Sequence, residues 1–158
     1  MATIYTHSAH CVGESNWHLQ FTPAYRRPIF GDQLTRELTV AYLIEAAQEL
    51  NLHVGAIDCG PDHIHLFIQE TRKHSVIDVV QKLKGSSSYK MRKRHWYLFK
   101  HHLWGNKFWS AGYFYQTVGA ITAESVKKYV AEGQQKHWVK QEKQQTLFNY
   151  SHQTPFGL

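Results

Sequence analysis

Alternation of apolar and polar residues predicts four strands. Residues 17–21 (Trp-His-Leu-Gln-Phe) and 63–68 (His-Ile-His-Leu-Phe-Ile) both have a period of two, which is typical of strands with one buried face. A further strand is expected at about 53–58, joined to 63–68 by a Gly-Pro turn as a hairpin. The last strand is expected at 113–118, where a glycine follows.

Three segments have the spacing of helices. The first runs from about Asp32, a plausible N-cap, to Leu50. The apolar residues predicted to form its buried face are Leu34, Leu38, Ala41, Ile44 and Ala47. The second helix begins near Ser75 and continues into a polar, basic stretch. The third runs from a cap at Thr122 to about Trp138.

The predicted order of elements is therefore β-α-β-β-α-β-α. Its first six elements match an α+β, ferredoxin-like (RRM-like) fold, with a four-stranded antiparallel sheet and helices on one face. The seventh is a C-terminal helix. We expect one domain over residues 1–138 and a Gln-rich tail over 139–158. The fold alone implies no function, because this sheet occurs in RNA-binding modules and in many enzymes.

Composition favours a polyanionic partner with exposed bases. The chain has 158 residues, with 18 Lys and Arg against 12 Asp and Glu, and 14% of its residues are aromatic. Positive side chains bind phosphates and rings stack on bases, although charge alone also fits an ordinary basic protein.

The remaining composition bears on location. Cys11 and Cys59 form no metal-binding or disulfide pattern, which indicates a reducing cytoplasm. No apolar run approaches a membrane span, and the N-terminus lacks the apolar core of a signal peptide. We therefore expect a cytoplasmic protein with no membrane association.

His63 and His65 are the first candidates for chemistry. Residues two apart on a strand point to one face with Cα atoms about 6.6 Å apart, so both imidazoles can reach one divalent ion. Ile64 between them would point into the core. Strand faces also often carry two histidines that bind no metal, and the spacing alone leaves that alternative open.

Tyr129, on the third predicted helix, is the second candidate. A phenol with a pKa of about 10 can attack a phosphodiester and can also leave again. The oxygen ligands that could complete a metal site with two histidines lie on the same helix, at Glu132, Gln134 and Gln135. The alternative is that Tyr129 only packs beside neighbouring valines.

Basic residues gather on and after the second predicted helix. Between residues 90 and 102 they are interleaved with aromatic rings, so that cations could meet phosphates while rings accept bases. The alternative is a solvated helix end and loop. The residues predicted to bind nucleic acid are Arg26, Arg27, Lys84, Lys90, Arg92, Lys93 and Arg94.

Five sequence blocks carry a resemblance over about residues 17–134. They are FTPAYRR (21–27), PDHIHL (61–66), LKGSS (83–87), WGNKFWS (104–110) and the stretch 113–130, which runs from Tyr-Phe through Thr-Val-Gly to Lys-Lys-Tyr-Val. In this order they resemble the small transposases of IS200/IS605-type insertion sequences, which are HUH enzymes with a single catalytic tyrosine. Five ordered blocks are far more specific than any one of them.

The resemblance implies roles for these residues. His63 and His65 would be the metal ligands for Mg²⁺ or Mn²⁺, and Tyr129 would be the nucleophile. The substrates would be single-stranded element ends that carry short imperfect hairpins. The tyrosine would keep the 5′ phosphate and release a free 3′-OH. Such enzymes act as homodimers, and the resemblance implies that each tyrosine serves the partner's metal site.

The chain departs from the family pattern at Gly133, where the family usually has a glutamine ligand four residues after the tyrosine. A local widening of the helix at this glycine would bring Gln134 round to the site. Alternatively Glu132, three residues after the tyrosine, serves from the correct face, or the site is lost. We take Gln134 as the third ligand, with Glu132 as the alternative.

Three other functions stay open. A HUH relaxase or replication-initiator nuclease uses the same chemistry, usually in a longer chain. A non-enzymatic RNA-binding module would have stacking aromatics on the central strands, where this chain has His63 and His65. A domesticated transposase that binds hairpin DNA without cutting is supported only by Gly133.

Overall fold

A four-stranded antiparallel sheet forms the centre of the computed structural model, which describes residues 6–119, 122, 124–128 and 132. Its strands are β3 (Asn16–Phe21), β4 (His53–Cys59), β5 (Ile64–Gln69) and β6 (Phe114–Val118), in the order β4-β5-β3-β6. The first and third of these strands lie at the centre, which is the ferredoxin-like order. The predicted fold class is confirmed.

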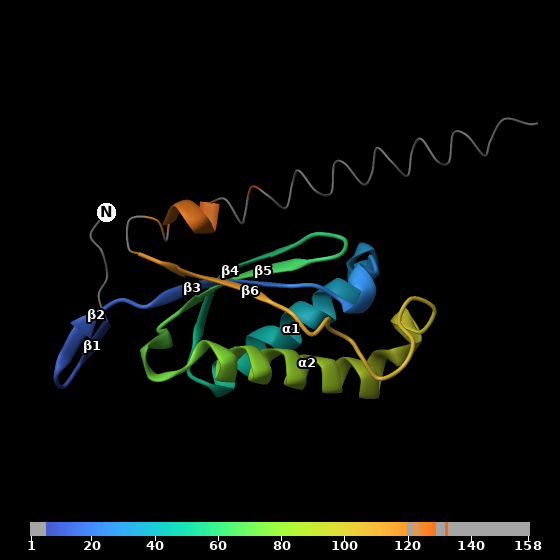
Figure 1. The fold of residues 1–158 in the computed structure, drawn as a ribbon, viewed down its shortest axis with the longest axis horizontal. Coiled ribbons are helices and arrows are strands. Elements are labelled where there is room, and N and C mark those ends of the chain that lie inside the picture. The colour runs from blue at the N-terminus through green and yellow to red at the C-terminus, as the bar shows by residue number, and fades with distance from the viewer. Residues whose placement is uncertain (1–5, 120–121, 123, 129–131, 133–158) are drawn as a thin grey trace, which may run out of the picture.

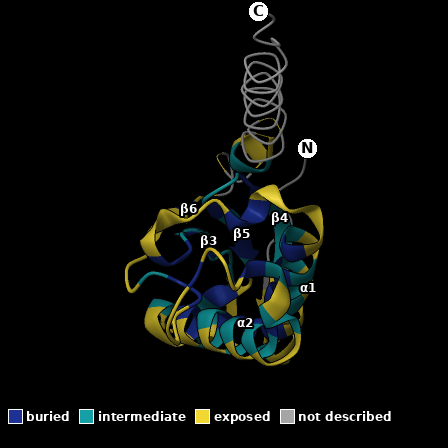
Figure 2. Ribbon diagram, turned by 90° about the vertical axis from the view of Figure 1, so that its right-hand side faces the viewer, coloured by how far each residue is buried: buried dark blue, intermediate teal, exposed yellow. Residues whose placement is uncertain are grey.

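Two helices cover one face of the sheet, as Figures 1 and 2 show. They are α1 (Gln33–Glu49) and α2 (Val76–Phe99). Asp32 caps α1 by accepting a hydrogen bond from the backbone N–H of Thr35 at 2.7 Å, and Ser75 caps α2 in the same way. Helix α2 has 24 residues, so most of the basic stretch lies on a helix and not in a loop.

Short elements complete the described chain. A hairpin of β1 (Thr6–Ser8) and β2 (Cys11–Gly13) precedes the main sheet and was not predicted. The three 3-10 turns are η1 (Ala24–Arg26), η2 (Ile29–Gly31) and η3 (Thr71–Lys73). No helix in the described part of the chain has the length and apolar character needed to cross a bilayer.

The main core lies between the sheet and the helices. From β5 it takes Ile64, Leu66 and Ile68, all fully buried, and β3 contributes Leu19 and Phe21. These residues alternate along their strands, as the hydrophobic pattern predicted.

The predicted buried face of α1 is confirmed at Ala47, and Leu38 packs against the core, but the prediction is wrong at Leu34 and Ala41. The residues that α1 buries are Thr35, Thr39, Leu43, Ala46 and Ala47, whereas Leu34 is 46% exposed and Ala41 is exposed. The hydroxyl of Thr39 donates to the carbonyl of Thr35 at 2.7 Å, and that of Thr35 donates to Asp32. Because these hydroxyls are hydrogen-bonded locally, their burial costs little, and a count of apolar residues alone misplaced the face.

The other face of the sheet carries a second, smaller apolar cluster. Phe67 and Val118 are buried there, with Ala56 and Val126 packed against them. Val126 belongs to a terminal helical segment, of which residues 122, 124–128 and 132 are described. This segment therefore packs on the face of the sheet opposite α1 and α2 (Figure 1).

Candidate active site

The β4–β5 hairpin places two imidazoles side by side. His63 directly precedes β5 and His65 is its second residue, and their ring centroids are 5.1 Å apart. His63 is 8% exposed and His65 is half-buried, whereas Ile64 between them is fully buried in the core. The two rings thus share the face opposite the helices, as the alternation predicted.

The imidazole of His63 lies directly against Gly60. The backbone N–H of Gly60 donates to the carbonyl of His63 at 2.9 Å and closes the turn. A Cβ atom at position 60 would lie 2.7 Å from Nε2 and 2.8 Å from Nδ1 of this ring. Any side chain at this position would therefore displace the imidazole.

Each imidazole has a hydrogen-bond partner at Nδ1. Nδ1 of His63 lies 2.8 Å from Oδ1 of Asp62, and Nδ1 of His65 lies 2.9 Å from Nε2 of His18. Partial burial raises the pKa of Asp62, but its hydrogen bond with His63 and the nearby charge of Arg26 outweigh this and hold the pKa below its usual value. Metal-binding histidines commonly use their second nitrogen in such a bond, which fixes the ring orientation.

His18 is a site residue that the sequence analysis did not single out. It lies on β3, and its ring stacks on that of His65 with centroids 5.1 Å apart and planes inclined by 28°. Burial lowers the pKa of His18, which favours the neutral ring. The alternation in residues 17–21 could have placed His18 on this face, but only strand pairing brings it to His65.

The proposed nucleophile and third ligand fall largely outside the described residues. Tyr129, Gly133 and Gln134 lie there. Glu132 is described, and it pairs with Lys128 at 3.8 Å on the surface. Among the residues that the structure describes, no group of three or more His, Cys, Asp and Glu could hold a metal. The paired imidazoles offer two nitrogen donors that suit a metal ion, and both the metal site and its third ligand stay predictions.

The terminal helical segment packs next to the imidazole pair. Val126 packs against Phe67, and Nζ of Lys127 lies 5.6 Å from the centroid of the Phe67 ring. A Cβ atom at Gly55 would lie 2.8 Å from Cε of Lys127, so this glycine leaves the space that the lysine occupies. Since Phe67 follows His65 on the same face of β5, the residues just before Tyr129 lie on the imidazole face.

Several of the predicted DNA-binding cations are engaged within the chain. Nζ of Lys84 donates to the carbonyls of Ser110 at 2.6 Å and Gly112 at 3.0 Å, and burial lowers its pKa. Lys90 forms an ion pair with Glu45 at 2.9 Å. These two lysines therefore link α2 to other elements, and their role in binding stays a prediction.

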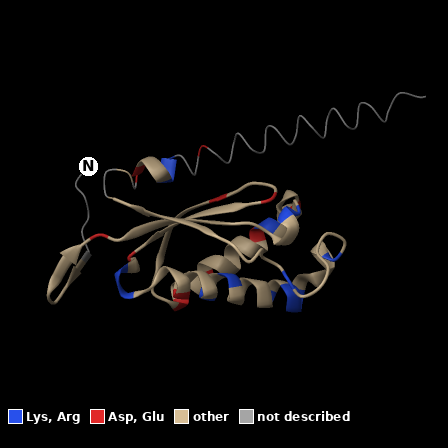
Figure 3. Cartoon of the chain, in the orientation of Figure 1, with Lys and Arg blue, Asp and Glu red and all other residues tan. Residues whose placement is uncertain are grey.

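The other predicted cations lie nearer the surface. Arg26 pairs with Asp62 at 3.4 Å, beside the imidazoles, and the guanidinium of Arg27 lies 5.3 Å from the ring centroid of Trp104. Lys93 and Arg94 are exposed on α2. Figure 3 shows Lys and Arg along α2 and in the loops, and β3, β5 and β6 contain neither.

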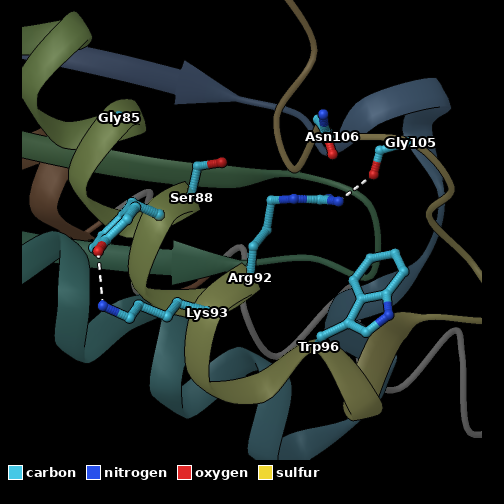
Figure 4. A pocket seen from close by; sticks show the side chains of 8 residues that line it. Gly85, Ser88, Arg92, Lys93, Trp96, Gly105 and Asn106 are labelled. Carbon is cyan, nitrogen blue, oxygen red and sulfur yellow. Dashed lines mark hydrogen bonds between the residues drawn. The ribbon is translucent and has the colours of Figure 1, made fainter.

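A groove of about 730 Å³ lies between α2 and the loop that follows it (Figure 4). It is lined by Gly85, Ser88, Tyr89, Arg92, Lys93, Trp96, Gly105 and Asn106. The guanidinium of Arg92 lies 4.7 Å from the Trp96 ring centroid and donates to the carbonyls of Gly105 and Lys107. Lys93 donates to the phenol of Tyr89 at 2.9 Å, which lowers the pKa of that tyrosine. Cations and rings thus line one groove, on the helix side of the sheet.

Comparison with known proteins gives a family match. The model of a family described as "Transposase IS200 like" matches residues 11–133. The chain is 29% identical over 119 residues to the ISDra2 transposase TnpA of Deinococcus radiodurans, covering 75% of this chain and 84% of that protein. It is 30% identical over 136 residues to the transposase for insertion sequence element IS200 of Salmonella typhimurium, covering 85% and 84%.

Two solved structures are also similar. A crystal structure of a transposase candidate from Deinococcus radiodurans has a TM-score of 0.64 at 27% identity, covering 80% of this chain and 96% of that one. A REP-associated tyrosine transposase bound to a REP hairpin has a TM-score of 0.58 at 10% identity, covering 85% and 74%. At that identity the second similarity concerns the fold alone.

Proposed function

The chain belongs to the family of IS200-like transposases, and we propose that it cleaves and rejoins single-stranded DNA at the ends of an insertion sequence. The observation that carries this proposal is the pair of adjacent imidazoles, His63 and His65, on the face of the sheet against which the terminal helical segment packs. That arrangement supports a phosphoryl-transfer site next to the segment that leads to Tyr129.

The proposed reaction uses Tyr129 as nucleophile. Its phenol oxygen attacks the scissile phosphorus, the 3′ oxygen of the neighbouring nucleotide leaves and takes a proton, and a 5′-phosphotyrosine forms. Attack by a 3′-OH then reverses the step and rejoins DNA, without ATP, because the phosphotyrosine bond retains the energy. A Mg²⁺ or Mn²⁺ ion held by His63, His65 and either Gln134 or Glu132 would polarise the phosphate.

The proposed substrate is a single strand with imperfect hairpins at the element ends. The REP-associated relative of similar fold is bound to a REP hairpin. In this chain the groove with Tyr89, Arg92, Lys93 and Trp96 offers rings and cations for such a strand. We place this activity in the cytoplasm.

Cleavage of single-stranded element ends in the presence of Mn²⁺ tests the proposal. Wild-type protein should form a DNA adduct that survives denaturing gels, and Tyr129→Phe should bind DNA without cutting it. Tyr97→Phe, which changes an exposed tyrosine on α2, is the matched control and should cut normally. Cutting by Tyr129→Phe at the wild-type rate would show that another group is the nucleophile.

Calorimetry with Mn²⁺ tests the ligands separately from cleavage. Replacing both His63 and His65 by Ala should abolish binding, whereas His101→Ala, at an exposed position, should not change it. Gln134→Ala and Glu132→Ala then identify the third ligand. If the wild-type protein binds hairpin DNA but neither Mn²⁺ nor a cleavable strand, the chain is a hairpin-binding protein that has lost the site at Gly133.

We also propose a homodimer whose two active sites are shared between subunits. An isologous pair would let each Tyr129 reach the partner's metal site. The contacts of Val126 and Lys127 with Phe67 of the same chain are those expected of the alternative, a self-contained site. Mixing His63→Ala with Tyr129→Phe separates the two arrangements. Shared sites regain cleavage in the mixed dimer, and self-contained sites stay inactive even when mixed dimers form.

A further inference from the structure

We propose that Phe114 is a stacking platform for one unpaired nucleobase of the strand whose phosphate lies at the imidazole pair. This inference rests on the proposed function and adds a substrate contact to it. It concerns strand β6, which none of the proposed catalytic steps uses.

Strand pairing aligns Phe114 with the imidazoles. Gln20 on β3 pairs with His65 on one side and with Phe114 on the other, so the three positions lie on one line across the sheet and point to one face. Two strand spacings, about 10 Å, separate β6 from β5. A nucleotide with its phosphate at the imidazoles, or the nucleotide next to it, can therefore place its base over Phe114.

The rings between these positions are in contact. The Phe114 ring centroid lies 5.8 Å from that of His18, which lies 5.1 Å from that of His65, which lies 5.1 Å from that of His63. We call these four rings the ring row. It runs from the edge strand β6 to the β4–β5 turn. Its neighbouring ring planes are inclined by 67°, 28° and 78° from Phe114 to His63, so each ring offers its own face or edge to a single strand.

Phe114 is the most exposed end of the ring row. Its side chain is 48% exposed, whereas His63 at the other end is 8% exposed. A phenylalanine ring has no polar atom to hydrate, so a base that covers it removes apolar surface from water. Unpaired bases are available for this contact, and such stacking changes affinity by about tenfold to a hundredfold per base.

The neighbouring aromatic residues do not share this position. Tyr115 is 52% exposed but pairs with Leu19, whose side chain lies in the main core, so Tyr115 faces the helix side. Strands β3, β5 and β6 carry no Lys or Arg, and the cations described near this face lie toward β5 and not at Phe114: Lys127 is over Phe67 and Arg26 pairs with Asp62. The chemistry therefore fits a base better than a further phosphate.

Abasic substrates with a matched pair of variants test the inference. Binding is measured by fluorescence anisotropy in a Tyr129→Phe background, with single-stranded element ends that lack one base at a time around the cleavage site. Phe114→Leu keeps an apolar side chain and removes the ring. It should weaken binding of the intact strand by about tenfold or more, and Tyr115→Leu should leave binding unchanged. Phe114→Trp should bind at least as well as the parent.

The abasic series identifies the base. At one position, removal of the base should weaken binding by the parent about tenfold and should not weaken binding by Phe114→Leu further. Equal sensitivity of both proteins at every position would overturn the inference. A change in oligomeric mass on Phe114→Leu would also overturn it, because Phe114 would then contact a second subunit. Absence of single-strand binding and cleavage by the protein with Tyr129 would instead overturn the proposed function, and this inference with it.

Discussion

The two faces of strand β5 share one backbone and differ in almost everything else. Toward the helices, Ile64, Leu66 and Ile68 are fully buried among apolar side chains. Toward the other face, His65 is half-buried and hydrogen-bonded to another ring from the next strand. Since side chains alternate along a strand, one short segment holds the fold together and presents the chemistry. The division is not complete, because Phe67 on the imidazole face is fully buried in the smaller apolar cluster, next to His65.

Polar side chains on the two sides of the sheet differ in where their hydrogen-bond partners lie. On the helix side, the hydroxyl of Ser87 donates to the carbonyl of Leu83 at 2.6 Å and accepts from Nε1 of Trp109 at 2.9 Å. The hydrogen bond from Trp109 links the loop before β6 to α2, and it is buried. On the other side, the imidazoles bond to side chains near solvent, where they can also meet a ligand. Substitutions on the helix side should therefore mainly lower stability, whereas substitutions of the imidazoles should mainly impair function.

Truncating the two faces should give the largest difference. Leu66→Ala should lower the free energy of unfolding by about 2–5 kcal/mol, because it opens a cavity in the core. His65→Ala, one residue away, should lower it by about 1 kcal/mol, for one lost hydrogen bond, while abolishing Mn²⁺ binding. Urea unfolding and calorimetry measure both quantities. Equal destabilisation by the two substitutions would contradict the division between the faces.

A smaller effect is expected from Gly60, which belongs to the turn and not to either face. Gly60→Ala should push the His63 ring out of place, lower Mn²⁺ affinity at least about tenfold, and destabilise the fold by about 1–3 kcal/mol. Gly85→Ala is the control, because an added Cβ there meets no atom within 4 Å and lies within α2. It should stabilise the protein by about 0.5–1 kcal/mol and leave Mn²⁺ binding unchanged. Unchanged Mn²⁺ affinity in Gly60→Ala would show that the turn does not position the ring.

The smallest effect concerns the helix layer alone. Asp32→Ala should lower the free energy of unfolding by about 1 kcal/mol with no change in Mn²⁺ binding, whereas Asp32→Asn should keep most of the cap. Hydrogen bonds from Thr35 hold the pKa of Asp32 below its usual 3.8. Its ionised form therefore contributes stability above pH 3.8 that is lost as the pH falls through the lower, folded-state pKa. Acid titration of unfolding should accordingly be less steep for Asp32→Asn, and identical curves would contradict the cap.

Much of the fold followed from local sequence patterns. The strands at 17–21 and 63–68 alternate strongly, and both helix caps were visible as Asp32 and Ser75. The buried face of α1 could not be predicted in this way, because threonines that bond to their own helix count as polar in a pattern and as apolar in the core. The β1–β2 hairpin is too short for periodicity to reveal it.

The site was predicted only in part, for a related reason. His63 and His65 are close in sequence, so spacing alone brings them together. His18 is 47 residues from His65, and its contact depends on the pairing of β3 with β5. The partners of Lys84 and Lys90 are also distant along the chain. The sequence therefore suggests that these lysines are available to bind DNA, although in the fold they bond to Ser110 and Glu45.

The β4–β5 turn also limits the insertions and deletions that are compatible with the site. An insertion or deletion of one residue between Gly60 and Ile64, if it were taken up by β5 and not by the turn, would shift the strand by one position and turn the imidazoles into the core and the isoleucines toward solvent. A change of two residues would restore the faces but would separate His63 from Gly60. Changes of length in this turn therefore affect either the faces of β5 or the position of His63, and we expect descendants of this sequence to preserve its length even where its residues change.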